Sequence, residues 1–161
     1  MAVRSTAALA ERAPALPRAS SLAALAGAIL VTIGTLGFIP GVTTGTLGFS
    51  SPESDARLLG LFEVSGLLNL VHLLFGVAGL VSSRSVAAAR VYFLVGGAIY
   101  LALSLYGSLV PRGGAGNVLS LNRADDWLHL LIGIAMIVTG LLTTCGPVSH
   151  GAVEAGRTTR S

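Results

Sequence analysis

Four long apolar segments constrain the fold of this chain more than any other feature. They cover residues 21–39, 58–81, 86–110 and 127–144. A bilayer core about 30 Å thick needs about 20 helical residues, so each segment is long enough, or nearly so, to cross a membrane. Only 11% of the residues are charged, whereas about 25% is typical of soluble domains. The sequence therefore predicts an all-α polytopic membrane protein, a four-helix transmembrane bundle.

The remaining residues form only tails and connections. We expect an N-terminal tail at residues 1–20, the transmembrane domain at 21–144 and a C-terminal tail at 145–161. This leaves no room for a separate soluble domain of about 100 residues. No nucleotide-binding loop, serine elbow or zinc-protease helix is found in the sequence. We therefore predict a non-enzymatic protein.

Arginine placement predicts the orientation in the membrane. Loops on the cytoplasmic side carry an excess of positive charge. The excess lies in both tails and in the connection between the second and third segments, at Arg4, Arg12, Arg18, Arg84, Arg90, Arg157 and Arg160. We expect a multi-pass protein of the plasma membrane with both termini cytoplasmic. Because the arginines are scattered, we predict the lipid bilayer as partner and no nucleic acid; a homo-oligomer or a membrane-protein partner remains open.

The first outward connection, residues 40–57, is rich in glycine, threonine and serine. Such a composition is typical of an irregular loop. We expect this loop to fold over the outer mouth of the bundle.

A short polar pattern occurs twice inside the apolar segments. Residues 69–78 read NLVHLLFGVA and residues 126–135 read DWLHLLIGIA, so that His72 and His129 occupy matched places. One complete hairpin separates the two copies, which therefore run in the same direction. This pattern predicts a parallel repeat of two helical hairpins.

The repeated polar residues share a helix face with glycines. At 100° per residue, each copy places its polar and small residues within about 80° of one another. The two sets are Asn69, His72, Gly76 and Gly79, and Asp126, His129, Gly133 and Gly140. Glycine lets helices approach closely, and a lipid-facing ionisable group is costly. We predict that both faces point into the bundle, with the glycines as helix-packing residues.

Three interpretations of His72 and His129 remain open. In the first, each imidazole hydrogen-bonds to a helix carbonyl or to Asn69 or Asp126 and holds the helices together, with no cofactor. In the second, the histidines bind haem or, with Asp126, a divalent metal for a redox or transport function. In the third, they move protons or a small solute through a polar chamber. Glu63 is a candidate for the chamber's rim, or a solvated carboxylate at the helix entrance.

Residues 60–73 and 121–130, with their Asn-x-x-His and Asp-Trp-Leu-His patterns, resemble the domain of unknown function 4383 family, which is largely actinobacterial. The resemblance extends over about residues 25–142. It implies four spans and a plasma-membrane location, and it brings no activity. The family usually has asparagine, histidine and asparagine where this chain has Ser65, Leu68 and Asp126. These departures weaken the metal interpretation.

Overall fold

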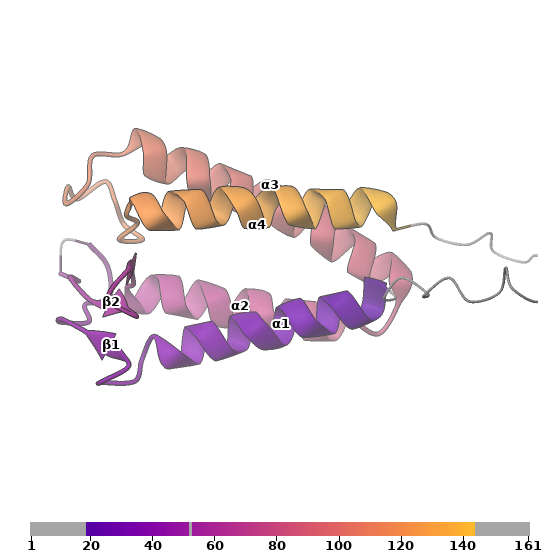
Figure 1. Cartoon of the computed structure of the whole chain (residues 1–161), viewed down its shortest axis with the longest axis horizontal. Helices are drawn as coiled ribbons and strands as arrows, with labels where there is room; N and C mark the ends of the chain where they lie inside the picture. The colour runs from indigo at the N-terminus through magenta and orange to yellow at the C-terminus, as the bar shows by residue number, and fades with distance from the viewer. Residues whose placement is uncertain (1–18, 52, 144–161) are drawn as a thin grey trace, which may run out of the picture.

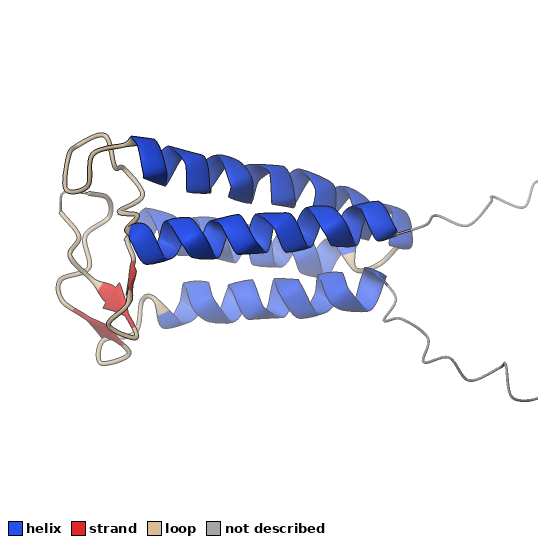
Figure 2. Cartoon of the chain, turned by 45° about the horizontal axis from the view of Figure 1, so that its top comes forward, coloured by secondary structure: helices blue, strands red, loops and turns tan. Residues whose placement is uncertain are grey.

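Four α-helices make up most of the structure, a computed structural model that describes residues 19–51 and 53–143. In chain order they are α1 Ala19–Leu36, α2 Gly66–Ser82, α3 Val86–Leu109 and α4 Arg123–Leu142. The helices lie alongside one another, with a small sheet at one end and both ends of the described chain at the other (Figures 1 and 2). Apart from residues 19–20, the predicted tails lie outside the described residues.

The second helix begins at Gly66 and not at residue 58, so the predicted start of this span was wrong. The reason is a turn at Leu59 and Gly60, whose φ angles of 55° and 69° lie in the left-handed region and interrupt any helix. Ser65 then caps α2, its hydroxyl accepting a hydrogen bond from the Leu68 N–H at 3.2 Å. The 17 residues of α2 cover about 26 Å at 1.5 Å per residue. The other three helices are long and apolar enough to cross a membrane.

The fourth helix begins at Arg123, earlier than the predicted residue 127. Asn122 is its N-cap and forms a capping box with Asp125, in which each side chain accepts from the other residue's backbone N–H. The polar residues before the apolar run are therefore part of the helix. They do not belong to the connecting loop.

The segment between α1 and α2 consists mainly of turns and loops, as expected for residues 40–57, but it also contains a small antiparallel sheet. Its strands are β1 Thr43–Thr44, β2 Arg57–Leu58 and β3 Phe62–Glu63, in the order β1-β2-β3. The sheet and its flanks bury Ala56, Leu58 and Val64 against partly buried side chains that include Ile33 and Leu36 of α1. This apolar contact fixes the connection over one end of the helices.

Glycines bring the helices together in two pairs, α1 with α2 and α3 with α4. A methyl group at Gly27 would lie 2.6 Å from the carbonyl oxygen of Gly76, and one at Gly97 would lie 2.9 Å from that of Gly133. Two further glycines sit at the same two contacts, namely Gly79 and Gly140. Backbones can approach this closely only where side chains are absent.

Large apolar side chains cover the outside of the helices. Leu25, Leu74 and Leu131 are 58%, 62% and 63% exposed, respectively. Polar residues such as Asn69 and His129 lie inside. An apolar exterior around a partly polar interior is compatible with a location in the membrane.

Candidate functional site

The two matched histidines meet inside the protein. His72 lies on α2 and His129 on α4, and their ring centroids are 6.4 Å apart, with 34° between the ring planes. His129 is 2% exposed and His72 is partly buried. The face predicted to point inward thus includes both rings, and the two copies of the sequence pattern contribute to one site.

An aromatic row extends from this pair across three helices. The Tyr100 ring of α3 lies 5.4 Å from that of His129 and 5.8 Å from that of Phe75 in α2, both in edge-on geometry. Tyr100 is 2% exposed. Edge-to-face aromatic pairs contribute about 0.5–1.5 kcal/mol beyond the burial of their area. The row therefore connects the α1–α2 hairpin to the α3–α4 hairpin, which also meet where Gly79 of α2 packs against Tyr92 of α3.

Several polar atoms near the pair have unused hydrogen-bonding capacity. Nδ1 of His72, Nδ1 of His129 and both side-chain polar atoms of Asn69 are buried without a hydrogen-bond partner among the residues that the structure describes. Asn69 packs against Gly37 just beyond α1, where no methyl group could fit. Most buried polar atoms in proteins bind another protein atom or an ordered water. These atoms could therefore bind water or a small ligand.

A chamber of about 140 Å³ adjoins the two histidines beneath the β2–β3 turn. Its walls are mainly leucine, isoleucine, valine and phenylalanine side chains, and its polar lining consists of Glu63, His72, Asp125 and His129. Sites for drug-sized ligands have volumes of about 300–1,000 Å³. Haem is larger than such ligands and does not fit this chamber, whereas a few waters or a small solute would fit.

Glu63 lies in β3 and not at the entrance of a helix, which corrects that part of the prediction. Its side chain pairs with Arg57 at 3.2 Å. Its backbone N–H donates to Asp125 Oδ2 at 3.1 Å. Asp125 also accepts from the Asn122 N–H at 2.9 Å, and thus fastens the sheet to the start of α4.

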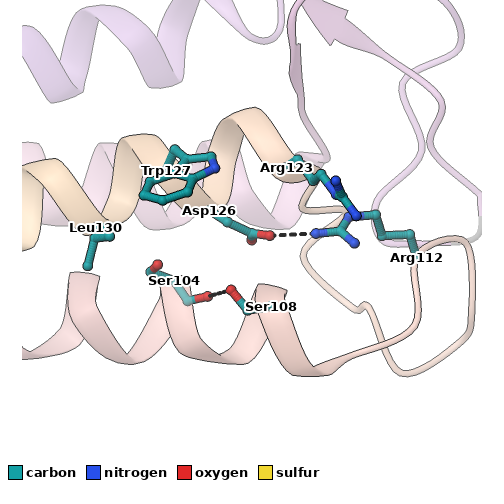
Figure 3. Close-up of a pocket in the computed structure, with 7 residues that line it drawn as sticks. All are labelled: Ser104, Ser108, Arg112, Arg123, Asp126, Trp127 and Leu130. Carbon is teal, nitrogen blue, oxygen red and sulfur yellow. Dashed lines mark hydrogen bonds and ion pairs between the residues drawn. The ribbon is translucent and has the colours of Figure 1, made fainter.

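Asp126 faces α3 and lies outside the histidine chamber. Its Oδ2 pairs with Arg112 at 2.8 Å, and its Oδ1 packs against Gly107. Figure 3 shows this ion pair in a separate groove. Within the described part of the chain, no cluster of three or more histidine, cysteine, aspartate or glutamate side chains could hold a metal ion. Asp126 therefore does not lie beside His72 and His129 as the predicted third ligand of a divalent metal.

These features define a class: a mainly helical protein whose long apolar helices are compatible with a membrane location. The chain belongs to the family described as domain of unknown function (DUF4383), whose family model matches residues 21–142. The resemblance noted in the sequence is thereby confirmed. No curated protein and no solved structure matches the chain.

Proposed function

We propose that this protein is a non-enzymatic, four-span integral membrane protein in which His72 and His129 join two repeated helical hairpins. The observation that carries the proposal is the 6.4 Å separation of the two imidazole rings, one from each hairpin. The expected hydrogen bonds of the imidazoles to Asn69 or Asp126 are not found in the described residues, so the pair joins the helices through packing of the rings. The aromatic row through Tyr100 adds to this effect.

Matched contacts in the two halves support the repeat. Asn69 packs on Gly37, and Asp126, at the matched place of the second copy, packs on Gly107. The close approach of Gly27 to Gly76 has a counterpart in that of Gly97 to Gly133. The N-caps Ser65 and Asn122 also occupy matched places before α2 and α4. Such agreement between pairs of contacts is expected for a duplicated hairpin.

The proposed location is the plasma membrane with both termini in the cytoplasm. Arg84 and Arg90 follow α2 at the end of the molecule opposite the sheet, which agrees with the positive-inside rule. Alkaline phosphatase is active only outside the cytoplasm. Fusions after residues 50 and 114 should therefore be active, and a fusion after residue 161 should be inactive. Activity of the C-terminal fusion would contradict this orientation.

The cofactor question is tested by an optical spectrum and elemental analysis of the detergent-purified protein and of the double variant His72→Ala/His129→Ala. We expect a colourless protein without stoichiometric metal, and a folded variant with lower thermal stability. A Soret band or bound metal that disappears in the variant would overturn the structural role and support a cofactor site.

Transport of protons or a small solute is a second candidate. The unpartnered imidazole nitrogens beside a chamber of about 140 Å³ favour it over haem binding. Proton flux into liposomes that contain the purified protein, measured with a pH-sensitive dye, distinguishes the two roles. A purely structural pair predicts no flux above that of empty liposomes, whereas flux that is lost in the folded His129→Ala variant would favour transport.

A further inference from the structure

A polar groove lies between the end of α3 and the beginning of α4, apart from the histidine chamber. Its volume is about 330 Å³. Its lining includes Ser104, Ser108, Arg112, Arg123, Asp126 and Trp127 (Figure 3). We refer to these six residues as the arginine groove. None of them lines the chamber beside the histidines.

The arginine groove has one more positive than negative group. Asp126 neutralises one guanidinium through its ion pair with Arg112. The Arg123 side chain makes no hydrogen bond or ion pair with any residue in the described ranges. Guanidinium groups bind phosphate oxygens through two parallel hydrogen bonds. The groove is therefore complementary to a ligand with a single negative charge, such as a phosphodiester.

The surroundings of the groove are those of a lipid-facing surface. Trp127 is 65% exposed, and Leu105 and Leu131 on the adjoining turns are 61% and 63% exposed. Tryptophan is enriched at the depth of lipid headgroups. A phosphate held by the arginines would place the attached acyl chains along these apolar side chains.

Asp126 holds one of the two arginines in place. Its side chain is 9% exposed, its Oδ2 accepts from Arg112 at 2.8 Å, and its Oδ1 is buried against Gly107. The carboxylate is therefore occupied within the protein, and Arg123 carries the uncompensated charge of the groove. A glycerol headgroup leaves the phosphodiester with a single net negative charge, whereas the cationic choline headgroup cancels that charge.

We propose that the arginine groove binds the headgroup of an anionic phospholipid of the phosphatidylglycerol type. Arg112 and Arg123 contact the phosphodiester, and Asp126 orients Arg112 through their ion pair. The acyl chains lie against Trp127 and the leucines beside it. This proposal requires that the helices lie in a bilayer, and it is independent of the role of the histidines.

Native mass spectrometry tests the proposal on the full chain in a mild detergent, titrated separately with phosphatidylglycerol and phosphatidylcholine. The decisive variant is Arg123→Gln, because this side chain is exposed and has no ion pair within the described residues. The control is Arg57→Gln, which removes the same charge at the same end of the molecule but outside the groove. We expect the unmodified protein to bind phosphatidylglycerol more tightly than phosphatidylcholine. Arg123→Gln should bind phosphatidylglycerol about tenfold more weakly than the unmodified protein, and the control should bind it with unchanged affinity.

Two results would overturn the proposal. Equal binding of phosphatidylglycerol by Arg123→Gln and by the unmodified protein, both with the same helical circular dichroism, would exclude the groove as the site. If millimolar inorganic phosphate displaced the lipid and itself remained bound to the protein, the groove would be assigned to small soluble anions. Retention of the lipid under the same phosphate concentration is the expected result.

Discussion

Replacement of Gly27 by leucine is expected to separate α1 from α2 and to destabilise the protein by about 3 kcal/mol, at the upper end of the usual cost of overpacking. The first carbon of the new side chain would lie 2.6 Å from the Gly76 carbonyl oxygen and 2.6 Å from the Leu80 backbone nitrogen. Both atoms belong to the backbone of α2, so no side-chain rotation relieves the overlap. Thermal unfolding in detergent, followed by helical circular dichroism, measures the loss.

The matched control for this substitution is Ala28→Leu. Ala28 is the next residue of α1, and its side chain is exposed. The same added volume therefore meets detergent or lipid and not another helix, and we expect little change in stability. Equal destabilisation by both substitutions would show that α1 does not pack on α2 through Gly27.

Replacement of Arg112 by methionine is expected to destabilise the protein by about 2 kcal/mol. The substitution leaves the Asp126 carboxylate, only 9% exposed, without its partner. Removing one member of a fully buried ion pair typically costs about 3–5 kcal/mol. The cost is lower here because the Arg112 side chain is 41% exposed, and solvent screens the interaction. A second replacement, Asp126→Asn, should restore most of the lost stability, because it removes the unpaired charge.

The control for the charge effect is Arg57→Met, which breaks the ion pair with Glu63. That pair is more open to solvent, with side-chain exposures of 53% and 26%. Exposed ion pairs contribute about 0.2–1 kcal/mol, so a small loss is expected. If Arg112→Met and Arg57→Met reduced the stability equally, the charged form of Asp126 would not be stabilised by Arg112.

The helices and the meeting of the histidines followed from local sequence patterns. Apolar length indicated the helical segments, although α2 starts later than predicted. The helical spacing of His72 with Gly76 and of His129 with Gly133 placed each ring on the face that packs inside. These features were predictable because helical periodicity and the cost of burying charge act over a few residues.

The contacts made by the connections could not be predicted in the same way. The partner of Asp126 is Arg112, across a glycine-rich turn whose path no local pattern determines. The pairing of β2 with β3 depends on the left-handed backbone at Leu59, which is an uncommon conformation for leucine. Glu63 therefore had no recognisable strand signal, and it was assigned to the adjacent helix.

A double-mutant cycle on His72 and His129 tests the central claim most directly. The free energies of unfolding of His72→Ala, His129→Ala and the double variant would be measured in the same detergent, with His129→Ala/Leu141→Ala as the control for distant residues. Because the two ring centroids lie only 6.4 Å apart, we predict a coupling energy of at least about 0.5 kcal/mol for the histidine pair, and additivity within about 0.3–0.5 kcal/mol for the control. Additive losses for His72 and His129 would contradict the claim that these side chains join the two hairpins.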